Sequence, residues 1–221
     1  MAADIYEIDH ARVCALLFDL GGVVIGVDFV RAFRVWAARA SCDPTELGRR
    51  FKFDAAFEEY ERGKLDASGY FAALRSSLGV ALSDEDLVAG WNDIYIGPVP
   101  EMAALLVAAG QRFPLFAFTN SNPTHQSVWA VRFAEELSVF RSVFVSSDLG
   151  LRKPDPDAFA AVASRMGLDP SAVLFFDDTL ENVDGALSAG MQAVLVTSVD
   201  DVRRALRTLE IEVRGVEEPE K

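Results

Sequence analysis

One stretch near the N-terminus decides how this chain folds: Val13-Cys14-Ala15-Leu16-Leu17-Phe18-Asp19-Leu20-Gly21-Gly22-Val23. Its first six residues are apolar without polar alternation, which is typical of a strand buried on both faces of a parallel sheet. Asp19 ends this run and opens a glycine-rich loop. An acid at the end of such a strand can accept a phosphoryl group, so Asp19 is a candidate nucleophile.

Four further apolar runs predict four more buried strands, at residues 113–118, 143–145, 172–176 and 193–196. Helical segments separate these runs and carry proline, capping or glycine boundary signals; they span 100–109, 156–166 after a capping Asp155, and 180–189. Pro114 lies inside its apolar run and argues against that strand, because proline removes a ladder donor and prefers the start or the edge of a sheet. This β-α repeat predicts an α/β protein with a three-layer Rossmann-like core around a parallel five-stranded sheet.

A different pattern interrupts the repeat between residues 28 and 98. Aromatic residues there alternate with charged residues at helical rather than strand spacing, which indicates a helical insert. Gly26 and the segment 97–100 flank the insert and are candidate hinges. The sequence therefore predicts a core domain formed by residues 1–27 and 99–221, and a helical cap domain formed by residues 28–98 that can close over the strand ends.

Composition limits the partners of this chain. Its 221 residues are 51% hydrophobic, which is enough to bury a sizeable core. The formal net charge of −13 argues against nucleic-acid and membrane-surface partners, whose phosphates would be repelled. Cys14, in a predicted buried strand, and Cys42, in a distant helical region, are expected to be reduced thiols. With no secretion signal or membrane-spanning run in the sequence, we predict a cytoplasmic location.

Polar side chains follow three of the predicted strands. Asp19, Thr119 and the pair Asp177-Asp178 each stand at such an end. Because ligands of open parallel sheets bind beyond the carboxyl ends of the strands, we expect these residues to converge, although each alone could be a helix cap or a loop acid. With Lys153 they supply a nucleophile, a hydroxyl, a cation and an acidic pair that suits a metal. That is the set of groups that phosphoryl transfer requires.

The order and chemistry of these motifs resemble the haloacid dehalogenase-like hydrolase superfamily, most of whose members are magnesium phosphatases. The resemblance implies that Asp19 forms an aspartyl-phosphate intermediate. It also implies that Mg²⁺ is held by Asp19, Asp178 and the backbone carbonyl of Gly21, with Asp177 as an outer-shell contact. Lys153 would then neutralise a phosphate oxygen, and two neighbouring residues would hydrogen-bond the phosphate: Thr119 and, through its amide, Asn120.

Gly21 departs from the superfamily pattern. Phosphatases usually carry a second aspartate there, which protonates the leaving oxygen and later activates water; such proton transfer is worth about 10²–10⁴ in rate. Dehalogenases of the superfamily also lack this acid, but they work without metal and match the pair Asp177-Asp178 poorly. The alternatives to a phosphatase are therefore a metal-free haloacid dehalogenase and a non-catalytic binding or regulatory protein that kept the fold.

Several motifs together look like bacterial α-D-glucose-1-phosphate phosphatases, namely DLGGV at 19–23, YERG at 60–63, TNSN at 119–122, SDLG at 147–150 and RKP at 152–154. Members of that group also carry glycine at the position of Gly21 and still hydrolyse phosphate esters. This closer resemblance implies a small phosphorylated metabolite as the substrate, such as a sugar 1-phosphate.

The closer resemblance also assigns substrate contacts outside the core motifs. Glu61 and Arg62 would reach from the cap toward the substrate, although an adjacent acid and base before a glycine is also typical of a solvated helix end. His125 could contact the sugar or donate a proton, or it could cap the helix that begins near Pro123. Asp28 could supply the missing acid, but an N-cap of the first cap helix is the favoured interpretation.

Overall fold

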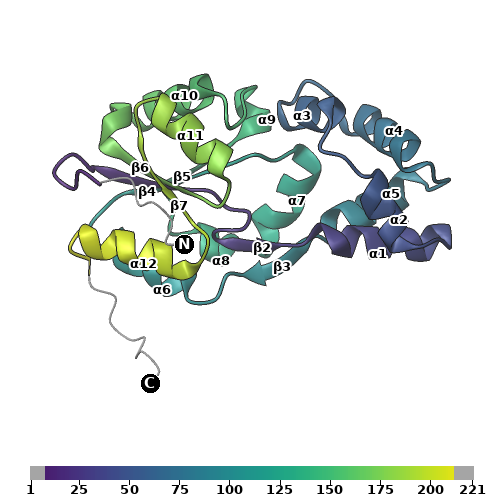
Figure 1. Cartoon of the computed structure of the whole chain (residues 1–221), viewed down its shortest axis with the longest axis horizontal. Helices are drawn as coiled ribbons and strands as arrows, with labels where there is room; N and C mark the ends of the chain where they lie inside the picture. Colours follow the sequence, from purple (N-terminus) through teal and green to yellow (C-terminus); the bar gives the residue numbers. More distant parts are fainter. Residues whose placement is uncertain (1–7, 212–221) are drawn as a thin grey trace, which may run out of the picture.

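The computed structural model describes residues 8–211, and its centre is a five-stranded parallel sheet with the strand order β5-β4-β1-β6-β7 (Figure 1). The strands are β1 Ala15–Phe18, β4 Leu115–Thr119, β5 Ser142–Val145, β6 Val173–Asp177 and β7 Gln192–Leu195. The five predicted strands are thus confirmed. Pro114 lies just before β4 and only its carbonyl joins the ladder, where it accepts a hydrogen bond from Leu16. The missing N–H of this proline therefore costs the sheet nothing.

Alternate residues of the central strand face two different helical layers. Leu16 and Phe18 pack into the cluster that also contains residues of α6 (Met102–Gly110) and α12 (Val199–Thr208). Ala15 and Leu17 face the opposite cluster, with residues of α10 (Pro156–Met166) and α11 (Leu180–Ser188). Figure 1 shows these two pairs of helices on opposite sides of the sheet. This is the predicted three-layer α/β architecture.

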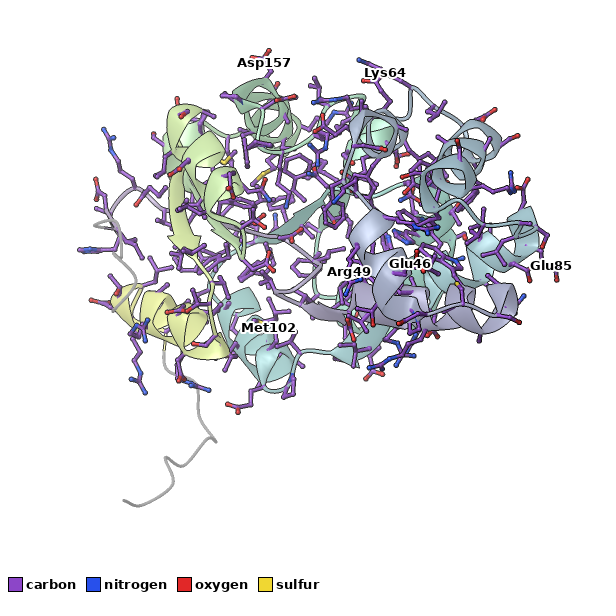
Figure 2. The ribbon with its side chains drawn as sticks, turned by 45° about the vertical axis from the view of Figure 1, so that its right-hand side comes forward. Glu46, Arg49, Lys64, Glu85, Met102 and Asp157 are labelled. Atoms are coloured by element: carbon purple, nitrogen blue, oxygen red, sulfur yellow. The ribbon has the colours of Figure 1, made fainter. Side chains whose placement is uncertain are left out.

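Three further helices and one 3-10 turn complete the core: α7 Pro123–Arg132, α8 Ala134–Leu137, α9 Ser146–Leu149 and η1 Pro170–Ala172. Along the helices, most apolar side chains face the interior and most charged side chains face solvent. Met102 is buried at the start of α6, whereas Glu46 is exposed, and Glu85 and Asp157 extend outward at the edge of the molecule (Figure 2). The apolar residues therefore form the interior and the excess acidic residues lie mainly outside.

Two local predictions need correction. Cys14 is exposed rather than buried, because it lies just before β1, which begins at Ala15. Asp155 precedes α10 as expected but makes no side-chain capping bond; its carboxylate instead accepts a hydrogen bond from Arg62 at 2.7 Å. A long-range ion pair thus replaces the local cap.

The predicted insert consists of helices, and an antiparallel ribbon joins it to the core. The helices are α1 Phe29–Ala40, α2 Pro44–Arg50, α3 Ala55–Glu61, α4 Ala67–Leu78 and α5 Asp84–Asn92. The ribbon pairs β2 (Ile25–Val27) with β3 (Tyr95–Pro98), so the two candidate hinge glycines, Gly26 and Gly97, lie opposite each other. The sequence did not predict this pairing, because strands of three and four residues carry too little pattern. The cap boundaries at residues 28 and 98 stay a prediction.

None of the helices within residues 8–211 is long and apolar enough to cross a membrane. The longest, α1 and α4, have 12 residues each, whereas a spanning helix needs about 20. The cytoplasmic location stays a prediction.

Candidate active site

The candidate active site lies at the carboxyl edge of the sheet, where three neighbouring strands end. Asp19 directly follows β1, Thr119 is the last residue of β4, and Asp177 is the last residue of β6. All three side chains are buried, with exposed fractions of 8%, 6% and 0%. The strand order thus brings together three residues that are about 60 to 160 positions apart, as the rule for parallel sheets predicts.

Lys153 joins this group from the loop before α10 and is only 1% exposed. Its Nζ lies 2.8 Å from Asp19 Oδ1 and 2.6 Å from Asp177 Oδ2. Asn120 holds the backbone of this residue on both sides, since its Oδ1 accepts from the Lys153 N–H and its Nδ2 donates to the Lys153 carbonyl, each at 2.9 Å. The Asn120 side chain therefore positions the lysine, which leaves its backbone amide for the predicted phosphate contact.

Burial and charge oppose each other within this cluster. Burial alone would lower the pKa of Lys153, but Asp177 and Asp19 outweigh it and raise that pKa above its ordinary value. Burial raises the pKa of Asp19 to about 7; Lys153 opposes this shift, and the neighbouring carboxylates Asp177 and Asp178 reinforce it. Burial also raises the pKa of Asp178, again with Asp177 adding to the shift. The acids outnumber the buried cation, so the site has room for another positive charge.

The three carboxylates are arranged so that they can hold a metal ion. Asp19, Asp177 and Asp178 each offer an oxygen within 4.8 Å of the others. The loop after β1 closes tightly on this group: Gly22 has a φ of +82°, and a Cβ there would lie 2.0 Å from Asp178 Oδ2. Oxygen ligands suit Mg²⁺, so the donor set fits the predicted ion.

Besides belonging to this carboxylate group, Asp177 accepts hydrogen bonds from the protein. Its Oδ1 accepts hydrogen bonds from the Thr179 N–H at 2.9 Å and from Asn182 Nδ2 at 3.0 Å, while its Oδ2 faces Lys153. Both oxygens are therefore held by donors. The outer-shell metal contact of Asp177 stays a prediction.

His125 lies in the pocket wall but is held on all sides by protein. Its Nε2 donates to the Trp91 carbonyl at 2.8 Å, its Nδ1 faces Asn122 Nδ2 at 3.2 Å, and its ring stacks on the Trp91 ring. The cap of α7 is Asn122, whose Oδ1 accepts from the His125 N–H. Because both ring nitrogens are already bonded, His125 joins the cap to the core in this structure and offers the substrate no free nitrogen.

Burial lowers the pKa of His125 to about 4, which leads to a prediction about stability. Below the unfolded-state pKa of about 6.5, the unfolded chain binds a proton that the folded chain excludes. We therefore expect the free energy of unfolding to fall as the pH drops from 6.5 to 4, by about 3 kcal/mol for this residue. Urea titrations across this range should show a shallower loss for His125→Gln than for the unmodified protein; parallel curves would contradict the assignment.

The cap contributes Glu61 and Arg62, and the structure separates their roles. Glu61 ends α3, is 5% exposed and lines the pocket, where its Oε2 accepts from Arg152 at 2.9–3.0 Å. Burial raises its pKa to about 7, against the lowering effect of Arg152. Arg62 does not line the pocket; it pairs with Asp155 outside it. Arg152 was missed as a site residue, although its position beside Lys153 was a usable signal.

Asp28 has the capping role that the sequence favoured. It is the N-cap of α1, and its Oδ1 accepts a hydrogen bond from the Val30 N–H at 2.9 Å. It is absent from the residues that line the pocket, so it has no contact through which to supply the missing acid.

The comparisons with known proteins agree with this geometry. The sequence profile of the haloacid dehalogenase-like hydrolase family matches residues 14–190, and the chain belongs to this family. A D-ribitol-5-phosphate phosphatase of Bacteroides thetaiotaomicron is 23% identical over 200 residues, which cover 88% of this chain and 97% of the relative. A phosphatase of Mycobacterium tuberculosis is 28% identical over 193 residues, covering 83% of this chain and 87% of the relative.

Among solved structures, a HAD family enzyme from Bacteroides thetaiotaomicron in complex with magnesium and inorganic phosphate has a similar fold. Its TM-score is 0.70 at 24% identity, with 83% of this chain and 93% of that chain covered. The relatives named above are phosphatases, but not specifically glucose-1-phosphate phosphatases. The comparisons therefore support the phosphatase class without selecting the closer group that the motifs resemble.

Proposed function

We propose that this chain is a magnesium-dependent phosphatase that hydrolyses a small phosphate monoester through an aspartyl-phosphate intermediate on Asp19. The observation that carries the proposal is the buried Lys153 held between Asp19 and Asp177, beside a third carboxylate, in the pocket at the carboxyl edge of the sheet. The phosphatase names of the relatives support it. The cluster of three carboxylates favours this function over a metal-free dehalogenase.

The proposed reaction needs two displacements at phosphorus. A carboxylate oxygen of Asp19 forms a bond to phosphorus while the bond from phosphorus to the leaving oxygen breaks, and water then displaces Asp19 to release inorganic phosphate. Lys153 neutralises charge on a transferring oxygen, and Asp177 keeps its ammonium in place. Magnesium, when bound by Asp19, Asp178 and the Gly21 carbonyl, would screen the repulsion between the nucleophile and the phosphate dianion.

Gly21 limits which leaving groups this chemistry accepts. A leaving group that departs without a general acid must come from a hydroxyl of low pKa. The anomeric hydroxyl of a sugar is more acidic than the hydroxyl of an ordinary alcohol. Sugar 1-phosphates and aryl phosphates therefore suit the site better than phosphates of primary alcohols. We include a sugar 1-phosphate among the proposed substrates on this ground.

We expect Gly21→Asp to speed hydrolysis of poor leaving groups by up to about 10²–10⁴. The position has room for the new side chain, since the nearest heavy atom to a Cβ there is Val27 Cγ2 at 3.6 Å. Single-turnover rates over a series of leaving groups should fall steeply with leaving-group pKa in the unmodified protein and less steeply in Gly21→Asp. Gly21→Asn is the matched control, because it adds the same volume without a proton. A flat dependence in the unmodified protein would mean that another residue already supplies the acid.

We expect Asp178→Ala to abolish both turnover and the stabilisation of the protein by Mg²⁺. A ligand at 100 times its Kd raises the free energy of unfolding by about 2.7 kcal/mol, so the effect is measurable in a thermal melt. Without metal the melt should be nearly unchanged, because the removed carboxylate has a pKa raised by burial and by Asp177. Asp184→Ala, at an exposed acid on α11, is the control. Full activity in excess chelator would rule out the proposed metal requirement.

A further inference from the structure

The pocket that contains Asp19 and Lys153 extends well beyond the space that a phosphate group needs. Its volume is about 870 Å³, within the range of roughly 300–1,000 Å³ that holds drug-sized ligands. The charged cluster lines part of it. Apolar side chains from the ribbon and the cap line it as well, and we call them the apolar wall: Ile25, Val27, Phe29, Phe53, Phe57 and Ile94.

Phe53 is the unusual member of this wall. It is 61% exposed, whereas every other aromatic residue within 8–211 is buried or half-buried. Its ring is nevertheless held in place by edge-on contacts with Phe29 at 5.3 Å and with Phe57 at 4.9 Å between ring centroids. A fixed aromatic ring left open inside a pocket is a preformed surface for an apolar ligand, because binding costs it little conformational freedom.

The charged side chains near the apolar wall already form ion pairs with one another. Arg152 faces Glu61 at 2.9 Å and Glu58 at 3.7 Å, so its guanidinium is shared by two acids. A leaving group rich in hydroxyls would press them against phenylalanine, valine and isoleucine side chains, where they lose hydrogen bonds to water. A negatively charged leaving group would meet the two glutamates.

We propose that the apolar wall binds the leaving group, and that the substrate is a phosphate monoester whose leaving group is uncharged, apolar and ring-bearing. This inference rests on the proposed phosphatase function. It also agrees with Gly21, because an aryl oxygen is acidic enough to depart without a protonating residue. Of the two leaving-group types that Gly21 allows, the wall therefore favours an aryl oxygen over the anomeric oxygen of a sugar.

The test compares kcat/KM, with Mg²⁺, for acetyl phosphate, phenyl phosphate, 1-naphthyl phosphate and α-D-glucose 1-phosphate. Acetyl phosphate reports on phosphoryl transfer alone, because acetate leaves without a proton and carries no ring. We expect kcat/KM to rise from phenyl to 1-naphthyl phosphate, and to be at least tenfold lower for glucose 1-phosphate than for 1-naphthyl phosphate. No turnover of acetyl phosphate would overturn the proposed function itself. Turnover of acetyl phosphate without a preference for the naphthyl ester would overturn the apolar wall alone.

A binding measurement removes the influence of leaving-group acidity. Phosphonates are not hydrolysed, so competitive inhibition by 1-naphthylmethylphosphonate and by methylphosphonate reports the contribution of the ring directly. We expect the naphthyl compound to inhibit at least tenfold more strongly. Equal inhibition by the two phosphonates would contradict the proposal.

Phe53→Ala links the preference to the wall. Because Phe53 is largely exposed, its loss opens no buried cavity, and a thermal melt can verify that the variant is folded. We expect the ratio of kcat/KM for 1-naphthyl phosphate to that for acetyl phosphate to fall at least fivefold. Val131→Ala, at a 78% exposed residue of α7 that does not line the pocket, is the control and should keep the ratio. An unchanged ratio in Phe53→Ala would overturn the role of the wall.

Discussion

Asp19→Asn should reduce phosphatase turnover by a factor on the order of 10⁶, the loss typical of removing a nucleophile from a covalent mechanism. An amide of the same shape still accepts from Lys153 but cannot form the acyl phosphate. Burst kinetics with an aryl phosphate, together with the mass of the protein after acid quenching, would measure both turnover and phosphorylation of Asp19. Turnover above 1% of that of the unmodified protein would identify a different nucleophile.

The same variant carries an internal control for folding. Burial and the neighbouring acids raise the pKa of Asp19, so its ionised form is unfavourable in the metal-free protein. Replacing it with a neutral side chain should leave the melting temperature in chelator unchanged or higher at pH 8. A clear loss of stability would mean that the activity loss reflects misfolding, and the assignment of Asp19 would then need another test.

Lys153→Met should have the largest effect on stability. The ammonium is buried between two carboxylates, and removing one partner of a buried ion pair typically costs about 3–5 kcal/mol, because the remaining charges lose their compensation. Urea denaturation in chelator would measure the loss. Turnover should also fall by about 10²–10³, as when one donor to a developing oxyanion is removed.

The loss of stability caused by Lys153→Met should grow as the pH rises. Without the lysine, the raised pKa of Asp19 rises further, so the folded state keeps a proton that the unfolded state releases. Stability then falls as the pH rises, and the deficit relative to the unmodified protein should grow between pH 5 and pH 8. Adding Asp19→Asn to Lys153→Met removes one of the uncompensated acids and should restore part of the stability. A double variant that is less stable than Lys153→Met would show that repulsion between these acids is unimportant.

The sequence predicts the parts of the fold in which burial restricts the residue types. The three central strands, β1, β4 and β6, are buried at every position, so their residues are apolar up to the strand ends, and that pattern is local. The central stretch from Val13 to Phe18 predicted a strand for this reason. The ends of the strands then place Asp19, Thr119 and Asp177 at one edge, because all parallel strands point the same way. The N-cap role of Asp28 was predictable too, since its partner Val30 is two residues away.

Contacts between distant segments were decided only by the tertiary structure. Arg62 was expected at the substrate and instead pairs with Asp155, 93 positions along the chain. His125 gave no sign in the sequence that its nitrogens would be held by Asn122 and by the carbonyl of Trp91 in the cap. The reason is physical: apolar periodicity reports which face of an element is buried, but the partner of a polar side chain depends on how whole elements pack.

Lys153 shows both what the sequence determined and what the tertiary structure decided. Its neighbours Arg152 and Pro154 marked a motif in the sequence, and the resemblance to a family implied its role. Its position between Asp19 and Asp177, however, arises because Asn120 holds the backbone of its loop and the surrounding fold buries its side chain. The sequence determined the chemical groups and the sheet edge where they meet. The packing determined which of them are buried together. Burial raises the pKa of Asp19, and the two carboxylates buried beside Lys153 raise the pKa of that lysine against the lowering effect of burial.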